Sequence, residues 1–404
     1  MLVSQLAVGQ DALRSNLAVD RVLPGTQGPP AEITPDEHHL GPVTFSPGVY
    51  AGAEFNDNVN LVPTDAQSDV IIRGGGTLDV NWSVTPQSAI TLGARIGYRH
   101  YVEHHQYDAL EIAPNSALTY NVTWDQGSLA FYDLFSYSQD VVSQAALSGL
   151  ASFPLLDNTV GTRLSLLPGK WLLEAGYSHN DYISDSSGFQ YLNRSSEYFF
   201  ARVGWRFAEQ TQAGVEGSAS LTTYKQTLQR DSRSVSLGGF ADWQLTRAIS
   251  ATLRGGPTYY TFYSAAGQPG STLNGYYYSL EIDHQLTDFL SYRAAVRHEI
   301  SLGYYPGSDY VEQTTVSCDL SCALTHRLSA GLNLNYVQGN QPFQIFIFRF
   351  TENFEQYGIS PSATWQLLDR LGLTMGYSHW ARSSNLPERG YAQNSIFLRL
   401  NYKF

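Results

Sequence analysis

Few side chains in this 404-residue chain are spaced for acid–base or nucleophilic chemistry. His179 and Asp181 would share one face of a strand, whereas the neighbours His298 and Glu299 would point to opposite faces. A hydrolase needs a nucleophile beside such a pair, and none is evident. The sequence has no GxSxG elbow, HExxH helix or phosphate-binding loop. We therefore expect that the protein is not an enzyme.

Metal binding is the other chemistry that the residue types allow. Four candidate ligands lie close together in the sequence: His100, Glu103, His104 and His105. Imidazole suits transition metals, but no second group of ligands can be placed near these residues from the sequence. The preceding segment offers three oxygen ligands without EF-hand spacing: Asp57, Asp65 and Asp69. The haem-attachment motif CxxCH is absent, so we expect no metal and no other cofactor.

The two cysteines, Cys318 and Cys322, are four residues apart in the chain. In a strand they would lie on the same face about 13 Å apart, at roughly 3.4 Å per residue. A disulfide requires Cα atoms closer than about 7 Å, and a CxxxC pair without a nearby histidine is a poor zinc site. We expect two small side chains on an apolar face.

Composition narrows the fold class. The chain is 43% hydrophobic and 13% aromatic, with 27 Tyr and 7 Trp, yet only 15% of its residues are charged, well below the usual quarter. No apolar run reaches 18 residues, so a helical membrane span is excluded. The net charge of −12 argues against a nucleic-acid partner. Many aromatic residues and few charges suit a β-barrel with one face in lipid and the other in water.

The elements that must position these residues are long strands. Eighteen segments alternate apolar and polar residues with period two, and most have 11–16 residues, enough to cross a bilayer at a tilt. They are 44–58, 69–84, 88–102, 112–124, 128–138, 157–167, 170–183, 195–207, 211–225, 233–245, 249–262, 273–286, 289–304, 311–325, 328–338, 353–367, 371–382 and 391–404. We predict an all-β fold, a transmembrane antiparallel up-and-down barrel of about 18 strands, with 16 as the alternative.

Connections of two lengths alternate between these strands. Short turns follow every second strand, and longer loops follow the others, among them Gln139–Leu156 and Gly339–Glu352. An outer-membrane barrel has this arrangement, whereas a soluble sandwich has no reason for it. Gln139–Leu156 is the one candidate for a long loop that folds inward.

The short turns also repeat in sequence. Gln244-Leu245-Thr246 is echoed by Gln285-Leu286-Thr287, Ala323-Leu324-Thr325 and Gln366-Leu367-Leu368, at intervals of one hairpin. Six tryptophans lie on apolar faces beside these turns, as in an aromatic girdle: Trp82, Trp124, Trp171, Trp205, Trp243 and Trp365. A WD40 propeller has a similar period, but its GH…WD signature is missing.

Charged residues on the opposite faces would line the barrel interior. Thirteen are candidates: Glu54, Arg95, Arg99, Glu174, Arg202, Glu216, Arg254, Glu281, Asp283, Arg293, Arg297, Glu299 and Asp319. Such charges need either water or a partner of opposite sign. A barrel of 16–18 strands leaves an aqueous channel, and the interleaved signs predict weak charge selection. The alternative is a wall of paired charges with no role toward a solute.

The last strand alternates most regularly. Five apolar or aromatic residues share one face: Ile396, Leu398, Leu400, Tyr402 and Phe404. This ending resembles the terminal strand of a bacterial outer-membrane β-barrel, where an aromatic last residue forms the signal that the barrel assembly machinery recognises. The resemblance assigns that role here to Tyr402 and Phe404.

Residues 1–43 differ from the rest, because they are rich in proline and show little alternation. We expect an irregular periplasmic segment there and the barrel in residues 44–404. Export to the outer membrane requires a signal peptide. Met1–Gln10 lacks the charged start and apolar core of one, so we expect that a leader was removed or that the start was assigned late.

The first strand ends in Ala51-Gly52-Ala53-Glu54-Phe55-Asn56-Asp57-Asn58-Val59. An aromatic residue followed by Asn-Asp-Asn resembles the opening strand of the β-barrel porin 2 type of outer-membrane protein. The repeated turns and Tyr402-Lys403-Phe404 fit the same group. The resemblance implies a link to envelope or exopolysaccharide systems.

Two functions remain open at this point. The first is an outer-membrane channel for passive diffusion or export of small or polymeric solutes. The second is a non-conducting barrel that acts as a scaffold or as a partner of an exopolysaccharide secretion system. Either would have outer-membrane lipid and the barrel assembly machinery as partners, together with polysaccharide or envelope proteins in the second case.

Overall fold

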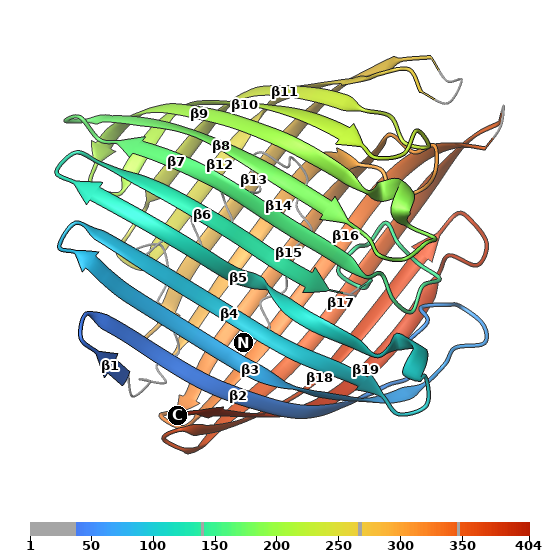
Figure 1. Ribbon diagram of the computed structural model, residues 1–404, viewed down its shortest axis with the longest axis horizontal. Helices are drawn as coiled ribbons and strands as arrows, with labels where there is room; N and C mark the ends of the chain where they lie inside the picture. The colour runs from blue at the N-terminus through green and yellow to red at the C-terminus, as the bar shows by residue number, and fades with distance from the viewer. Residues whose placement is uncertain (1–37, 139–140, 266–268, 346–347) are drawn as a thin grey trace.

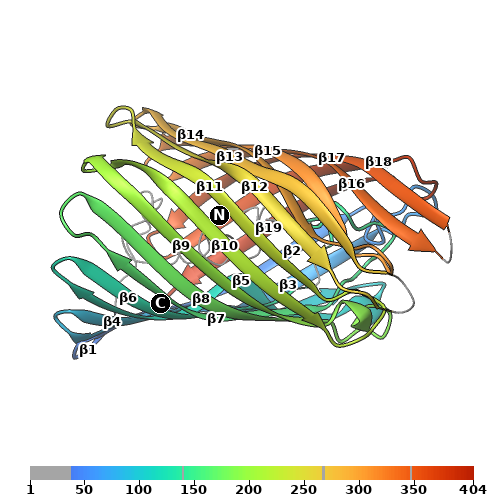
Figure 2. The same ribbon diagram turned by 90° about the horizontal axis from the view of Figure 1, so that it is seen from above.

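The computed structural model describes residues 38–138, 141–265, 269–345 and 348–404. Eighteen antiparallel strands, β2 to β19, each pair with their neighbours in the chain, and β19 pairs with β2 to close the sheet. The strands are tilted and surround a single interior (Figures 1 and 2). The predicted closed barrel is confirmed, with 18 strands rather than 16. No helix in the described ranges is long and apolar enough to cross a membrane.

The barrel strands follow the chain in order. They are β2 (Val43–Asn56), β3 (Asp69–Thr85), β4 (Ser88–Tyr101), β5 (Ala109–Trp124), β6 (Gly127–Ser138), β7 (Leu155–Leu166), β8 (Trp171–Ile183), β9 (Arg194–Ala208), β10 (Thr211–Tyr224), β11 (Ser232–Gln244), β12 (Ile249–Phe262), β13 (Ser271–Thr287), β14 (Leu290–Leu302), β15 (Tyr310–Thr325), β16 (Leu328–Ile345), β17 (Phe348–Leu368), β18 (Leu371–Ser384) and β19 (Tyr391–Lys403). Two short 3₁₀ turns, η1 (His105–Tyr107) and η2 (Gln190–Leu192), lie in the longer connections.

One predicted loop is wrong. Most of Gly339–Glu352 is strand, because β16 and β17 continue as a two-stranded hairpin beyond the rest of the rim, where Pro342 pairs with Thr351 (Figure 1). Beyond Asn340, β16 no longer pairs with β15. The proline therefore lies on an edge strand, where its missing N–H breaks no ladder. The aromatic and β-branched residues of this stretch favour strand over the loop that its glycine and proline suggest.

A short strand, β1 (His38–Leu40), pairs with the start of β2, with His38 opposite Phe45. It lies inside segment 1–43, which is predicted to be irregular; residues 1–37 of that segment are outside the described ranges. Lys403 pairs with Gly48. The end of β19 and the start of β2 therefore lie together, at the end of the barrel that carries the short turns.

The repeated turn sequence has a physical explanation. The amide of Gln285 donates to the Thr287 carbonyl at 2.6 Å, and the Thr287 hydroxyl accepts the Leu290 N–H at 3.0 Å. Gln244 with Thr246 and Gln366 with Leu368 repeat the glutamine contact. Side chains that bond to the backbone in this way favour turns over continued strand. Each repeat therefore ends one strand and begins the next.

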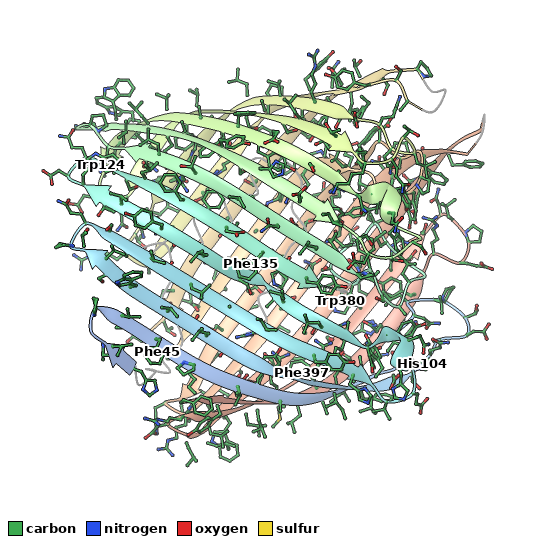
Figure 3. The ribbon with its side chains drawn as sticks, viewed as in Figure 1. Phe45, His104, Trp124, Phe135, Trp380 and Phe397 are labelled. Carbon is green, nitrogen blue, oxygen red and sulfur yellow. The ribbon has the colours of Figure 1, made fainter. Side chains whose placement is uncertain are left out.

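The outward face of the barrel is apolar between two aromatic rings. All six predicted girdle tryptophans are exposed at the short-turn end, where Trp124 is visible (Figure 3). Toward the long-loop end, exposed tyrosines form a second ring, among them Tyr98, Tyr177, Tyr276 and Tyr357. Aromatic rings bounding an apolar band are the pattern of a transmembrane barrel. Cys318 and Cys322 are free thiols.

Candidate functional site: a charged interior narrowed by one inward segment

A ladder of alternating charges crosses the inner wall from β7 to β12. Arg163 contacts Glu174 at 2.5 Å, and Glu174 accepts from Arg202 at 2.9 Å. Arg202 and Arg254 each approach Glu216, at 3.6 Å. All five side chains are buried. We call these five residues the charge ladder. They come from five different strands. The alternation of the sequence places them on the same face of the sheet, but only strand pairing shows that they are neighbours.

Aromatic groups enclose the charge ladder. The guanidinium of Arg202 lies 4.0 Å from the centre of the Phe240 ring, and the Tyr277 hydroxyl donates to Glu216 at 3.0 Å. A charged pair removed from water is stabilised only when its remaining hydrogen-bonding groups have partners. Here the pairing predicted from the interleaved signs forms, although Arg202 Nε and Glu216 Oε2, 3.6 Å apart, make no hydrogen bond to each other.

A second group of predicted interior charges lies on β13–β15. Arg293 contacts Asp283 at 2.5 Å and Glu281 at 3.3 Å. Nearby, Asp319 accepts from Asn333 at 2.6 Å. Glu299 is fully buried and accepts from Gln313 at 2.9 Å. Arg297 pairs in register with Thr315 of β15 and so shares the inward face.

A third group, on β2–β4 and β19, is unbalanced in sign. Arg73 pairs with Glu54 at 2.9 Å, whereas Arg95 and Arg399 both lie 5.9 Å from the Tyr50 ring. Within the described part of the chain, neither of these two arginines has a carboxylate at ion-pair distance. We call Arg73, Arg95 and Arg399 the arginine cluster.

The arginine cluster depends on two glycines. A Cβ at Gly97 would lie 2.0 Å from the Tyr50 hydroxyl, and one at Gly75 would lie 2.8 Å from it. The Tyr50 side chain can therefore lie across β3 and β4 only because Gly75 and Gly97 have no side chains. The remaining predicted charge on this wall, Arg99, pairs with Glu111 of β5. Arg73 and Glu111 were not predicted as interior charges. Arg73 could have been, because it lies six residues before the inward Asp79 in the same strand and therefore shares its face.

Within the described ranges, the interior is open toward the short-turn end. Four inward side chains there are exposed: Asp79, Gln285, Arg293 and Ser321. The side chains of the Arg293–Asp283 pair are 48% and 43% exposed, although both point away from the lipid-facing surface. A side chain that faces inward and is still accessible borders a space that water can enter.

The opposite end is filled by the connection between β6 and β7. Ala145, Ala146, Leu147 and Phe153 of this connection are buried. Its residues pack against side chains of the far wall and of other loops, including Val311, Val337, Phe354, Tyr191 and Tyr391. The predicted inward loop is therefore present; we call its described part, residues 141–154, the inward segment. Figure 1 shows it in teal, inside the long-loop end.

Backbone carbonyls hold the inward segment to the far wall. Arg382 donates from Nε to the Ala145 carbonyl at 2.8 Å, and Gln356 donates to the Val142 carbonyl at 3.1 Å. The Tyr305 hydroxyl donates to the Ala146 carbonyl at 3.0 Å. Burial raises the pKa of Tyr305, so its hydroxyl keeps the proton that it donates. These bonds fix the path of the segment without depending on its side chains.

Arg382 belongs to a triad that the sequence did not reveal, in which Arg382 and Glu352 are fully buried and Arg389 is partly exposed. Glu352 accepts from Arg382 and from Arg389, each at 2.8 Å, and Arg389 lies 3.8 Å from the Tyr305 ring. Glu352 and Arg389 lie in segments predicted as loops, where no face could be assigned. We call these three residues the latch triad.

The candidate catalytic residues do not form a catalytic group. His179 contacts Asp181 at 3.4 Å and Glu197 at 2.8 Å on the outward face. The nearby hydroxyl of Ser195 donates to Asp181 at 2.6 Å rather than to the histidine. A serine nucleophile needs the imidazole as its base. His298 and Glu299 lie on opposite faces, as predicted, with His298 stacked on Tyr276 at 4.5 Å.

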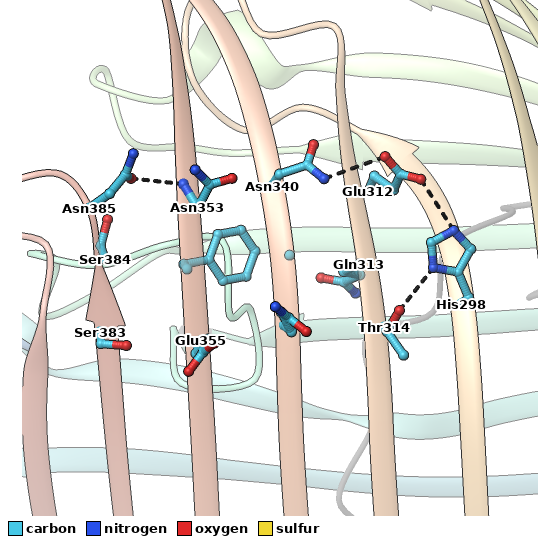
Figure 4. Close-up of a pocket in the computed structure, with 13 residues that line it drawn as sticks. His298, Glu312, Gln313, Thr314, Asn340, Asn353, Glu355, Ser383, Ser384 and Asn385 are labelled. Atoms are coloured by element: carbon cyan, nitrogen blue, oxygen red, sulfur yellow. Dashed lines mark hydrogen bonds and ion pairs between the residues drawn. The ribbon is translucent and has the colours of Figure 1, made fainter.

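A polar recess of about 560 Å³ lies in the wall formed by β14–β18, near the long-loop end. His298 contacts Glu312 at 3.3 Å and Thr314 at 2.9 Å, and Asn340 donates to Glu312 at 3.4 Å (Figure 4). These side chains hold outward positions beyond the ring of tyrosines. Its lining also includes Gln313 and Ser384, which donate to the interior carboxylates of Glu299 and Glu352.

Comparison with known proteins agrees with this architecture. OccK2 (OpdF) of Pseudomonas aeruginosa superposes with a TM-score of 0.50 at 11% identity, over 91% of this chain and 99% of that one. The fold is that of the outer-membrane porins. A BenF-like porin from Pseudomonas fluorescens Pf-5 gives 0.49 at 8% identity, over 89% and 99%. Pseudomonas aeruginosa OpdL gives 0.47 at 13% identity, over 90% and 99%.

No protein-family model matches the sequence, and no curated protein matches it either. The resemblance to the β-barrel porin 2 type stays a prediction from its short motifs. At such low identity the structural likeness concerns the fold alone and does not identify a solute.

Proposed function

We propose that this protein is a channel of the bacterial outer membrane, through which small or polymeric solutes diffuse or are exported. The observation that carries the proposal is the exposed Arg293–Asp283 pair inside a closed 18-strand barrel. A barrel of this size leaves an aqueous space when side chains do not fill it. The exposed inward charges border such a space at the short-turn end.

The two aromatic rings support the placement in the membrane. In outer-membrane barrels short turns face the periplasm and longer loops face the exterior. The inward segment and the latch triad would then narrow the extracellular mouth, and the hollow part would open to the periplasm. The polar recess around His298 would lie at the level of the lipid headgroups, which makes outer-membrane lipid the first partner that we propose.

The proposed route places the narrowest point at the inward segment. A solute entering from outside would meet buried Phe354 and Gln356 and the latch triad before it reached the exposed charges below. The segment is held by hydrogen bonds to its carbonyls, and each contributes only about 0.5–1.5 kcal/mol net. The channel would therefore be narrow at rest and sensitive to changes in those few contacts.

Single-channel conductance in planar bilayers tests the proposal. We expect discrete conductance steps from the native chain and larger steps after residues 143–152 are replaced by a Gly-Ser linker. Replacement of the exposed loop residues Pro63–Ala66 is the matched control and should leave the steps unchanged. If neither the native chain nor the linker variant conducts, the proposal fails. A non-conducting scaffold, with the predicted polysaccharide-secretion partner, would then be the better account.

A further inference from the structure

Three polar side chains converge on the outer surface at the rim connection between β4 and β5. Asp108 Oδ2 lies 2.8 Å from His100 Nδ1 and 3.9 Å from His105 Nδ1. One donor atom from each residue lies within 4.8 Å of the others. The two imidazole rings are stacked, with centroids 5.1 Å apart and planes at 21°. Only His100 and His105 could be noted from the sequence, because Asp108 becomes their neighbour when η1 turns the chain back.

The scaffold holds the central carboxylate in place. The Tyr101 N–H donates to the other oxygen, Asp108 Oδ1, at 2.7 Å. This bond leaves Oδ2 directed at the two imidazoles. In metal sites, a carboxylate ligand is typically oriented by a hydrogen bond to its other oxygen. The remaining histidine of the loop, His104, is engaged elsewhere, because its Nδ1 lies 2.8 Å from Asp69 Oδ2.

The distances suit a first-row transition metal. Bonds of about 2.0–2.1 Å in a tetrahedral site separate ligand atoms by roughly 3.3 Å. The observed 2.8 and 3.9 Å lie on either side of that value, and all three donor atoms lie within 4.8 Å of one another, so a rotation of the exposed His105 side chain can bring them around one ion. Two imidazoles and one carboxylate suit Zn²⁺ and its neighbours rather than Ca²⁺ or Mg²⁺, which prefer oxygen ligands.

We propose that His100, His105 and Asp108 form a surface site for a divalent transition metal ion, with Zn²⁺ as the reference ion. Three protein ligands leave at least one coordination position for water or for an outside donor. The side chain of His105 is 65% exposed, so the open position faces solvent. The site lies just beyond outward Tyr98, above the apolar band and away from the interior.

Competition between the barrel and a chromogenic chelator for Zn²⁺ tests the site. The full chain is refolded in detergent without a polyhistidine tag. We expect one equivalent of Zn²⁺, with affinity reduced at least tenfold in His100→Ala, His105→Ala and Asp108→Asn. His104→Ala is the matched control and should bind Zn²⁺ like the native chain, because its imidazole is held by Asp69. Ca²⁺ in large excess should not displace the bound Zn²⁺.

His105→Ala is the decisive variant, since an exposed side chain can be removed without unfolding the rim. Resistance of the barrel to SDS before heating verifies the fold of each variant. The Co²⁺ form should show visible absorption bands that His105→Ala abolishes. Native affinity in His105→Ala would overturn the proposal and leave His100–Asp108 as a plain ion pair. An equal loss in His104→Ala would also overturn it, by showing that Zn²⁺ binds to the rim histidines without a defined site.

Discussion

Arg382 donates from Nη2 to Oε1 of Glu352 at 2.8 Å, and neither side chain has any exposed surface. The same guanidinium donates from Nε to the Ala145 carbonyl. The same arginine thus joins the barrel wall at the long-loop end, through Glu352, to the inward segment, through Ala145. Removing one member of a buried pair commonly costs about 3–5 kcal/mol, because the other charge is left without its partner.

We predict that Arg382→Ala loosens the inward segment. Glu352 keeps Arg389 as a partner, so the barrel should still assemble, while the bond to Ala145 is lost. Amide hydrogen exchange in residues 141–154 should become at least tenfold faster, and the conductance steps should grow. Arg327→Ala is the control, because the Arg327–Asp369 pair is 3.9 Å long and exposed and so contributes little. Unchanged exchange in Arg382→Ala would show that apolar packing alone holds the segment.

The second prediction concerns the centre of the charge ladder. Arg202 contacts Glu174, Glu216 and Asp242, so Arg202→Ala would leave buried carboxylates facing one another. The free energy of unfolding should fall by about 3 kcal/mol or more, measured by urea titration in lipid vesicles. Arg247→Ala, at an exposed turn position, should change it by less than about 0.5 kcal/mol. Equal values for the two variants would mean that the ladder is not a stabilising element.

The faces of the interior residues could be predicted because the side-chain period of a strand is two. Once Leu290 is placed outward, Arg293 and Arg297 must point inward, and the turn repeats fix which strands are neighbours. This logic ends where strands end. Ala145 and Arg382 are 237 residues apart in sequence, and no periodicity relates a loop carbonyl to a guanidinium on the far wall. For the same reason the sequence could not show that Asp108 lies beside His100 and His105, or that Glu352 lies between Arg382 and Arg389.

The third prediction concerns the aromatic end of β19. Phe404 and Tyr402 are exposed on the outward face, with their rings edge to face at 5.2 Å. The Phe404 N–H donates to the Pro47 carbonyl at 3.1 Å, across the closing seam. Deleting Phe404, or changing both residues to Asp, should reduce the amount of barrel in the outer membrane severalfold. Immunoblots of membrane fractions measure this amount.

A matched control separates assembly from stability. Phe207 is exposed near the short-turn end of β9, so Phe207→Asp places a charge at a similar depth but away from the last strand. A charge near the interface costs only about 0–1 kcal/mol. We expect near-normal membrane levels for this variant. If the Phe404 deletion also reached normal levels, its aromatic ring would have no part in recognition by the assembly machinery.

The fourth prediction concerns ion selectivity. Paired opposite charges leave a weak net field, whereas charges of one sign would focus ions. The charge ladder and the pairs of Arg293 with Asp283 and Glu281 are neutralised. We therefore expect only a mild preference for cations, from acidic residues of the long loops such as Asp57, Asp65 and Asp185. The preference should fade with salt, which screens over about 10 Å at 0.1 M. Reversal potentials under a salt gradient measure the preference, and strong anion selectivity that persists after Arg95 and Arg399 are both replaced with Ser would contradict the pairing.

The unbalanced arginine cluster makes this prediction sharper. Arg293 is neutralised by Asp283 and Glu281, so Arg293→Ser, alone or with Arg297→Ser, should move the reversal potential little. Arg95 and Arg399 have no carboxylate partner within the described ranges, so replacing both with Ser should shift the potential clearly toward cations. If the Arg293 variants caused the larger shift, ions would pass along the β13–β15 wall rather than past the arginine cluster. Equal shifts would show that net charge, and not pairing, sets the field inside the barrel.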